Sequence, residues 1–593
     1  MNKNKQWDLS VFYPSEEAFL ADLEAFKALI PSISAFSGKI STEEGLAGYL
    51  STDKKITLAY IKLAFFSSMR ADLDRKNTLF TSDESKVELA VQSLIAASSY
   101  FEPEVLAYGE ENVKAFLSKH PEFEEYSFYF EKLFRGQRHV LDAEKEKMLS
   151  HFAPLSGEAG DLYSILTVAD YKPKTVTLSD GREVVVSTAN WTSLIGKEKK
   201  AEDRKAIFDS LYSYYEDHKS TYGEIYNLGL QTQLAFKEVR GYSSILDTHL
   251  FKDAIPEKVF TSLIEVASSE EGSAPLKKYY ELRRKYLGLE KHRSYDRFLQ
   301  LARSEKTYTY EEAKDLFFAS IQSFPSDFQE KAHEVLAPGY VDVESAPGKR
   351  TGAYSNGGYD VHPFILLNFQ GELDDVFTLA HESGHSIHTL YSEESQPTLK
   401  QDYTIFVAEI ASTFNEHNLL DYLLQSDSLS KNDRIALLQK AIDEICSTFY
   451  RQTLFGHFEY EAAKLAEARE PIHFEALNAI MVRLYKDYYG IDITEEVYKP
   501  LVWAYIPHLF YTPFYVYQYA TSFTSSMLIY ERVKKQEPGA FDSYLSLLRS
   551  GGSKFPVDQV KEAGVDLTTK EPFLAVIHRM KELVDLLEKE LAE

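Results

Sequence analysis

The sequence contains almost no cysteine and no long apolar stretch. Its single cysteine, Cys446, excludes a disulfide within the chain and is typical of a protein from a reducing compartment. Residues 1–15 contain no apolar core of signal-peptide length, and no other segment approaches the length of a membrane span. We therefore expect a cytoplasmic protein that does not use a membrane as a partner.

Positive charge is also scarce. The chain has 65 lysine and arginine residues against 91 aspartate and glutamate residues, which gives a net charge of −26. The excess is spread along the sequence and is not gathered in a tail. Such a field repels nucleic acid and anionic lipid, so we expect neither as a partner, whereas it attracts cationic substrates mildly.

Internal repeats, low-complexity tracts and clear interdomain linkers are absent as well. The composition is that of a folded protein, with 44% hydrophobic residues, 26% charged residues, 40 tyrosines and 38 phenylalanines. A chain of 593 residues can form several domains or one multilobed unit. We place one boundary near residue 190, between an N-terminal helical domain (1–190) and a second domain (191–593) that carries the motifs described below.

Helical periodicity dominates both parts of the chain. Ser15 is a candidate N-cap for the first long helix. The apolar stripe of that helix is expected to comprise Phe19, Leu20, Leu23, Phe26 and Leu29. Because a helix with one apolar stripe must bury it, we expect these helices to pack against one another.

Two segments interrupt the helical pattern. Residues 174–188 alternate β-branched and polar residues around Asp180-Gly181, which predicts a β-hairpin near 175–188. Residues 339–369 are rich in glycine, proline and strand formers, and should form a few short strands. An exposed strand edge can hold the backbone of an extended peptide, and we assign Gly352 and Tyr354 from this segment to substrate binding.

The segment LAHESGHSIH (379–388) carries three of the 16 histidines in the chain. Its surroundings have helical periodicity, behind the candidate caps Asp374 and Asp375. His381 and His385 are then one turn apart on one face, so their imidazoles converge. The residues expected to face a core are Val376, Leu379, Ala380 and Ile387.

This H-E-x-x-H arrangement predicts a zinc site. The two imidazoles bind the ion, and Glu382 deprotonates a zinc-bound water without being a ligand itself. Gly384 costs about 1 kcal/mol relative to alanine inside a helix, so we expect another backbone to pass close to it. The alternative is a solvated helix face whose histidines make ordinary hydrogen bonds.

A catalytic zinc site needs a third protein ligand. His388 occupies the position where the longer H-E-x-x-H-x-x-G-x-x-H pattern has glycine, so we expect a core or outer role for it. Glu409 lies in an apolar stretch of the next predicted helix, where an unpaired carboxylate is costly, and we favour it as the ligand. Glu416 is an alternative ligand or outer hydrogen-bond acceptor, and a core ion pair is the alternative role of Glu409.

A second unusual segment, residues 503–523, is rich in tyrosine. If a helix follows Pro507, then His508, Tyr511, Tyr515 and Tyr519 share one stripe, with Tyr517 facing elsewhere. Pro513 predicts a kink or a new helix start within the segment. The stripe could be an ordinary aromatic core, or it could line a cleft opposite the zinc, bind substrate backbone and donate hydrogen bonds to an oxyanion.

With these motifs in hand, the chain resembles the thimet-oligopeptidase-like metallopeptidases of family M3, and among them the bacterial oligoendopeptidase F branch. The resemblance runs nearly end to end and is most specific around the histidine motif. It is carried by WDLSVFYPS near the start, MRADLDRKN (69–77), GKRTGAY (348–354), PFILLNFQGELDDVFTLAHESGHSIH (363–388), FVAEIASTFNE (406–416), IPHLFYTPFYVYQYATS (506–522) and SGGSKFPVDQVKEAGVDL (550–567).

The resemblance implies a mainly α fold, a multilobed helical ellipsoid with a deep central substrate channel and a few short strands near the active site. It implies one zinc ion per chain, bound by His381, His385 and Glu409, with Glu382 as general base. His508 and Tyr515 match the family's oxyanion segment, and Tyr511 and Tyr519 its substrate segment, although the spacing after the histidine differs among branches. Such a channel admits short unstructured peptides and excludes folded proteins.

The expected activity is that of a zinc-dependent oligoendopeptidase, which hydrolyses internal bonds of short peptides. Aminopeptidases of the G-x-M-E-N type are disfavoured, because Ser355 stands where their glutamate would be. Release of dipeptides from the C-terminus remains an alternative, as does an inactive helical peptide-binding protein. The sequence leaves monomer and homodimer equally open.

Overall fold

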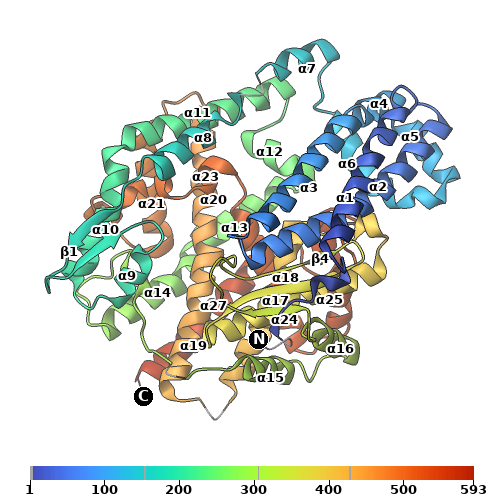
Figure 1. Cartoon of the computed structure of the whole chain (residues 1–593). Coiled ribbons are helices and arrows are strands. Elements are labelled where there is room, and N and C mark those ends of the chain that lie inside the picture. Colours follow the sequence, from blue (N-terminus) through green and yellow to red (C-terminus); the bar gives the residue numbers. More distant parts are fainter. Residues whose placement is uncertain (1–4, 153–154, 305, 427–428, 593) are drawn as a thin grey trace. The chain divides into compact units, whose positions relative to one another are not determined.

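Helices make up most of the computed structural model, which describes residues 5–152, 155–304, 306–426 and 429–592 (Figure 1). The fold class is therefore mainly α, as the periodicity predicts. None of the helices in these ranges has both the length and the apolar character needed to cross a membrane. The chain divides into two compact units, each built from three segments: unit 1 from Met1–Arg138, Lys306–Tyr422 and Ile529–Gly564, and unit 2 from His139–Glu305, Leu423–Leu528 and Val565–Glu593. The boundary near residue 190 stays a prediction.

Unit 1 begins with a group of packed helices (Figure 1). Ser15 caps the first of them by accepting the backbone N–H of Ala18, as predicted. Its buried stripe is spaced by alternating steps of four and three residues, so Leu20 and Leu29, which stand beside that line, are exposed, contrary to the prediction. The helices are α1 (Glu16–Ile33), α2 (Glu43–Leu73), α3 (Thr78–Ser98), α4 (Phe101–Tyr108), α5 (Glu110–Lys119), α6 (Ser127–Gln137), α15 (Tyr310–Ser320), α16 (Ser326–Val335), α17 (Leu373–Ser395), α18 (Ile405–Leu424), α25 (Ala540–Leu548) and α26 (Pro556–Glu562).

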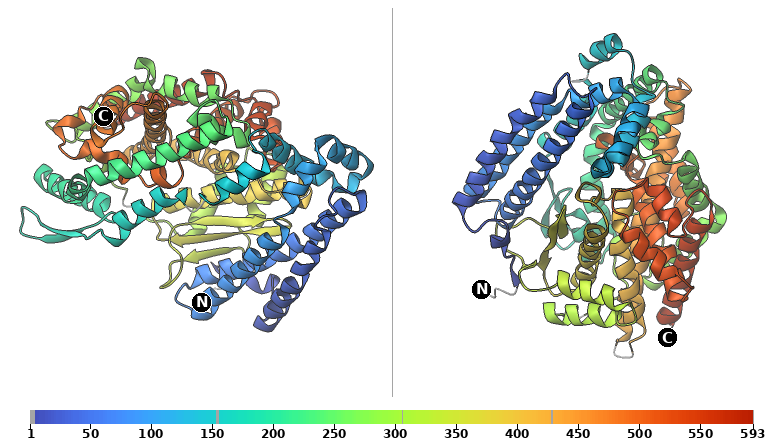
Figure 2. Two further views of the ribbon diagram at one scale, coloured as in Figure 1. Left: turned by 90° about the horizontal axis from the view of Figure 1, so that it is seen from above. Right: turned by 90° about the vertical axis from the view of Figure 1, so that its right-hand side faces the viewer.

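A three-stranded sheet separates the N-terminal helices from α17. It is formed by β3 (Val341–Glu344), β4 (Tyr354–Gly358) and β5 (Val361–Phe369), which confirms the expected strands in 339–369. The central strand β5 pairs parallel with β3 and antiparallel with β4, so β4 is an edge strand. Phe364 and Leu366 join the core of the N-terminal helices, while α17 packs against β4 and β5 (Figure 2, left).

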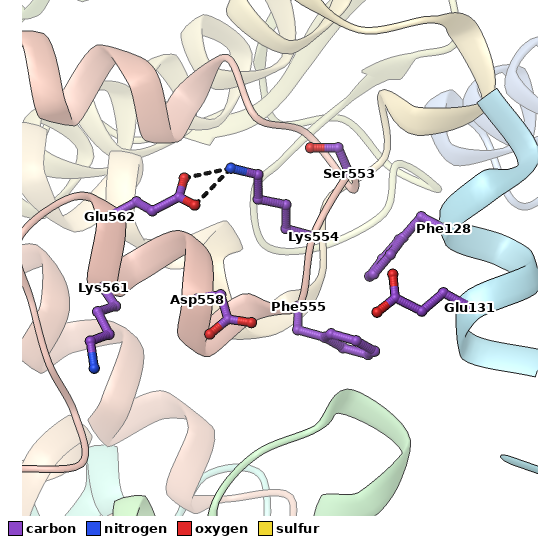
Figure 3. Close-up of a pocket in the computed structure, with 8 residues that line it drawn as sticks. All are labelled: Phe128, Glu131, Ser553, Lys554, Phe555, Asp558, Lys561 and Glu562. Atoms are coloured by element: carbon purple, nitrogen blue, oxygen red, sulfur yellow. Dashed lines mark hydrogen bonds and ion pairs between the residues drawn. The ribbon is translucent and has the colours of Figure 1, made fainter. Parts of the chain in front are cut away.

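The third segment of unit 1 anchors a loop beside the start of α18. Gly552 donates its backbone N–H to the carbonyl of Lys400, at 2.8 Å. Further along the loop, Phe555 packs edge-on against Phe128 of α6, with ring centroids 5.0 Å apart (Figure 3). Lys554 pairs with Glu562 of α26, also drawn there. The bond between Gly552 and Lys400 holds the segment that leads into α18.

In the part of unit 2 that the structure describes, the secondary structure is helical apart from one hairpin. Strands β1 (Lys174–Thr177) and β2 (Glu183–Val186) pair antiparallel around Asp180-Gly181, and Gly181 has the left-handed φ of 86° that such a turn needs, so the predicted hairpin is confirmed. Its helices are α7 (Ala143–Ser150), α8 (Glu158–Ser164), α9 (Trp191–Lys197), α10 (Ala201–Asp217), α11 (Lys219–Arg240), α12 (Ile245–Leu250), α13 (Glu257–Ser268), α14 (Glu270–Tyr286), α19 (Lys431–Glu444), α20 (Arg451–Glu467), α21 (Phe474–Tyr489), α22 (Val502–Tyr505), α23 (His508–Tyr511), α24 (Tyr517–Lys534) and α27 (Glu571–Ala592).

Candidate metal centre and active site

The histidine motif lies on α17, as its periodicity predicts. The N-cap is Glu372, two residues before the first candidate cap, and Asp375 completes a reciprocal capping box with it. The four apolar residues expected to face a core, Val376, Leu379, Ala380 and Ile387, are fully buried. Their burial fixes the rotation of the helix, so His381 and His385 both point away from that core on one face.

Gly384 lets α18 cross α17 at close range. A Cβ atom at this position would lie 2.5 Å from the carbonyl oxygen of Ala411 and 2.6 Å from the Cα atom of Ser412. The expectation that another backbone passes here is confirmed. Asn415 ties the crossing together, since its side-chain amide donates to the carbonyl of Ala380 at 3.1 Å. This close approach brings Glu409 of α18 to the two histidines.

The side chains of His381, His385 and Glu409 form a compact group. Nε2 of His381 and Nε2 of His385 are 3.2 Å apart. Oε2 of Glu409 lies 3.3 Å from the first nitrogen and 3.5 Å from the second. Three donors that bind one zinc ion at about 2.0–2.1 Å in tetrahedral geometry lie about 3.3–3.4 Å from one another. The donor set therefore fits a metal ion, and these are the described residues whose metal-binding atoms meet within 4.8 Å.

Burial and neighbouring charges shift the pKa values of His381, His385 and Glu409. Burial would lower the pKa of His381, but hydrogen bonds to the carboxylates of Glu409 and Glu416 outweigh it and raise that pKa. Burial and the charge of His381 lower the pKa of His385 to about 4. Burial opposes the ionisation of Glu409, yet the hydrogen bond from His381 and the charges of both histidines lower the pKa of its carboxyl group to about 2. The group thus offers an ionised carboxylate beside a neutral imidazole.

Glu416 contacts the other side of His381. Its Oε1 atom pairs with Nδ1 of His381, so the ring is held from behind while Nε2 faces Glu409. A carboxylate in this position fixes the tautomer and orientation of a metal-binding histidine. The sequence left two roles open for Glu416, a metal ligand or an outer hydrogen-bond acceptor. This contact favours the outer acceptor.

Glu382 is buried next to the group but is not part of it. Its Oε2 atom has no hydrogen-bond partner among the described residues, while its carboxylate accepts the backbone N–H of Ser355. Burial and the neighbouring carboxylates raise the pKa of Glu382 to about 7, although the charge of His381 opposes them. An orphaned carboxylate oxygen with a pKa near neutrality is suited to exchange a proton with a bound molecule.

His388 takes no part in the group. Its ring is fully buried and stacks on Tyr403 with ring centroids 3.6 Å apart. Burial, with the nearby charge of His385, lowers the pKa of His388 to about 3. It is a neutral core histidine.

The edge strand β4 contacts α17 through Ser355, whose Oγ lies 2.8 Å from Oγ of Ser386. Its neighbour Tyr354 points to the opposite face of the sheet and donates its hydroxyl to Asp72 of α2 at 2.9 Å. Gly352 precedes the strand, is exposed, and its carbonyl accepts the side-chain amide of Asn368 at 2.7 Å. Of these residues, Ser355 is the one that reaches Glu382, and sequence analysis gave it no role in the site.

The tyrosine segment belongs to unit 2. The chain breaks between α23 and α24, so the interruption expected at Pro513 is confirmed. His508, Tyr515 and Tyr519 nevertheless gather, with ring centroids 5.5–6.5 Å apart. Tyr511 leaves the stripe: it is about half exposed and packs edge-on against Tyr163 of α8. Tyr517 faces elsewhere, as expected, and is buried against Phe260.

Comparison with protein families gives two matches in neighbouring parts of the chain. The model described as "Peptidase family M3" matches residues 194–579, and the model described as "Oligopeptidase F" matches residues 104–172. The first match covers more than half of the chain and includes the histidine motif, Glu409 and the tyrosine segment.

Curated relatives align along the whole chain. Group B oligopeptidase PepB from Streptococcus agalactiae is 31% identical over 589 residues, covering 98% of this chain and 97% of its own. Oligopeptidase PepF from Bacillus subtilis is 31% identical over 585 residues, covering 98% of this chain and 87% of its own. Among solved structures, a protein from Chlamydophila abortus superposes with a TM-score of 0.92 at 31% identity, covering 100% of this chain and 99% of its own.

Proposed function

Because the chain belongs to peptidase family M3, in its oligopeptidase F branch, we propose that it is a zinc-dependent oligoendopeptidase that hydrolyses internal bonds of short unstructured peptides. The observation that carries the proposal is the meeting of His381, His385 and Glu409 beside the orphaned carboxylate of Glu382. Two imidazoles and one carboxylate form the ligand set of catalytic zinc in several peptidases, and they leave a coordination position open.

In this proposal, each chain binds one zinc ion through His381, His385 and Glu409. When bound, zinc would supply a Lewis acid that polarises the peptide carbonyl and makes water more acidic. Glu416 orients the imidazole of His381 from its Nδ1 side. Glu382 takes a proton from the attacking water at its free Oε2 atom and delivers it to the leaving amine.

Metal analysis tests the ligand set. We expect about one zinc per purified chain and loss of peptidase activity with a chelator, both restored by added zinc. Glu409→Ala should abolish stable binding, whereas Glu416→Ala, which removes an outer contact, should weaken zinc affinity about 10–100-fold. Equal losses in the two variants would contradict the distinction between ligand and outer acceptor, and a folded, active chain without metal would refute the proposal.

The variant Glu382→Gln tests the general base. It keeps the size and the hydrogen-bond acceptor of the side chain but cannot take a proton, so we expect kcat/KM to fall by about 10²–10⁴-fold. Zinc content should stay at the wild-type level, and both quantities are measured on the same preparation. Retained turnover in this variant would contradict the role of Glu382.

We also propose roles for the remaining candidates. His508 and Tyr515 donate hydrogen bonds to the oxyanion, and Tyr519 and Tyr511 bind the substrate. These assignments rest on the family match over residues 194–579, which includes the tyrosine segment, and on the gathering of the rings of His508, Tyr515 and Tyr519. Gly352 and Tyr354 act through their backbone, because the hydroxyl of Tyr354 is already bound to Asp72.

Peptides blocked at one end separate the proposed activity from its alternative. An endopeptidase cleaves an internal bond when either terminus is capped, whereas release of dipeptides from the C-terminus requires a free carboxylate. We therefore expect amidation of the C-terminus to leave the cleavage site unchanged. Cleavage that stops on amidation would favour the dipeptide-releasing enzyme.

A further inference from the structure

A large pocket of unit 1 lies outside the group of His381, His385 and Glu409. It encloses about 1050 Å³ between α2, α3 and the hairpin of β4 and β5. The surface of its wall is mostly apolar and is formed by Tyr60, Ile61, Ala64, Phe65, Val87, Leu89 and Val91. Polar groups come from Thr57, Ser67, Ser68, Glu84, Ser85, Glu88, Gln92, Asn356 and Tyr359. Leu89 is 69% exposed, although it is a leucine next to an apolar hollow. A pocket of this composition is suited to apolar side chains of a ligand.

The strand β4 connects this pocket with the candidate active site. Successive side chains of a strand point to opposite faces. Ser355 faces α17, where it contacts Ser386 and the carboxylate of Glu382. The next residue, Asn356, lines the pocket on the other face, beside its partner Phe364 in the core of the N-terminal helices. One residue along β4 thus separates the two sites.

The outer edge of β4 offers a way for one peptide ligand to reach both the pocket and the candidate active site. Among the described residues, β4 pairs as a strand with β5 alone, so its outer edge is open to a further strand, although the backbone N–H of Ser355 is donated to Glu382. A peptide added there as a further strand would continue the alternation of the sheet. Every second side chain would then face α17, and those between would face α2 and α3.

From this arrangement we propose that the pocket between α2, α3 and β4 is a specificity subsite for side chains of the peptide substrate. The proposal rests on the proposed function and adds the chemistry of the preferred side chains. Residues of one face recur about every 6.6–6.8 Å along an extended peptide, so the pocket has room for more than one of them. It receives bulky apolar side chains, at positions that alternate with those facing Glu382.

Charge at the rim extends this preference to cationic side chains. The carboxylate of Glu84 is paired with Arg75 at 2.7 Å, but Glu88 has no ion-pair partner among the described residues. Arginine and lysine side chains can bury their alkyl stems against an apolar wall while the charged end stays in water. We expect the pocket to accept phenylalanine, leucine and arginine, and to reject aspartate and glutamate.

Two matched variants of α3 test the subsite. Ser85 lines the pocket and Ser93 does not; both are exposed, and each hydroxyl bonds to the carbonyl four residues earlier. Ser85→Trp should fill part of the pocket, whereas Ser93→Trp adds the same side chain outside it. The measurement is kcat/KM for a set of peptides in which glycine, phenylalanine, arginine or aspartate occupies each position around one cleaved bond.

We expect wild type and Ser93→Trp to prefer phenylalanine and arginine over glycine and aspartate by about 10-fold or more at one or two alternating positions, because the pocket buries the apolar part of these side chains. Ser85→Trp should reduce this preference several-fold. Glu88→Gln should lower the preference for arginine alone. Peptides cleaved with the same preferences by all variants would overturn the subsite, whereas no cleavage by the wild-type chain would overturn the proposed function instead.

Discussion

At the scale of single residues, Glu459 of α20 is an example of a buried carboxyl group that fixes a strained turn. Its Oε1 atom accepts the backbone N–H of Phe514 at 2.7 Å, and Phe514 has a left-handed φ of 56° between α23 and α24. Burial raises the pKa of Glu459 to about 8, although the N–H of Phe514 opposes this shift. The turn carries Tyr515, so the protonation of one buried group bears on the shape of the tyrosine segment.

The raised pKa of Glu459 predicts that stability falls as pH rises from about 4.5 to about 8. Because the folded state holds this proton more tightly than the unfolded state, the stabilisation is fully present below the ordinary pKa of 4.5 and is lost as pH rises through about 8. We expect the urea midpoint of the protein to decline between pH 6 and pH 9. In Glu459→Gln this slope should be smaller, while Glu224→Gln, an exposed control on α11, should behave like wild type. Identical slopes in all three proteins would contradict the prediction.

At this scale, predictions from the sequence were confirmed where the spacing of residues along a helix alone determines which way their side chains point. The i and i+4 positions of His381 and His385 bring them together on any straight helix, and the apolar surroundings of Glu409 signal a compensating partner. The backbone N–H that Ser355 gives to Glu382 could not be predicted, because it depends on how an edge strand meets α17. Glu459 could have been singled out in the same way as Glu409, but its partner is a backbone group of a remote turn.

At the scale of elements, the crossing of α17 and α18 controls the candidate metal site. Gly384→Ala would place a methyl group 2.5 Å from the carbonyl oxygen of Ala411, so the helices must move apart. Such overpacking typically costs about 1–3 kcal/mol, and here it also draws Glu409 away from the histidines. We expect a lower unfolding midpoint and weaker zinc binding, measured by thermal denaturation and metal titration.

Gly136→Ala is the matched control for this substitution. Gly136 lies in α6, and a Cβ atom there would meet no atom within 4 Å. Replacing glycine by alanine at an unhindered helical site stabilises by about 0.4–1 kcal/mol. Loss of zinc affinity in both variants, or in neither, would show that the crossing distance is unimportant.

Predictions of helices and strands were confirmed where a short stretch of sequence determines the local structure. The Asp180-Gly181 turn and the glycine, proline and strand-forming residues of 339–369 were sufficient to locate both sheets. The predicted apolar face of α1 wrongly included Leu20 and Leu29, which lie beside the line of buried residues. The positions of α2 and α3 decide which face of α1 is buried, and the sequence of α1 does not specify them. The parallel pairing of β3 with β5 joins strands distant in sequence, which local patterns do not specify.

At the scale of the whole molecule, the net charge of −26 predicts a dependence on salt. A field of this sign speeds the approach of cationic peptides and slows that of acidic ones. The screening length falls from about 30 Å at 0.01 M to about 10 Å at 0.1 M ionic strength. We expect kcat/KM for a lysine-rich peptide to fall several-fold over this range and that for a glutamate-rich peptide to rise. Parallel changes for both peptides would contradict electrostatic steering.

The three-segment construction of unit 1 has a consequence for its synthesis. The segment Ile529–Gly564 supplies α25 and the loop that bonds to Lys400, so this unit is incomplete until Gly564 has left the ribosome. Until then, α17 and its histidines have been translated but lack some of their final neighbours. During that interval the part of α17 that α25 covers in the finished fold stays open to solvent.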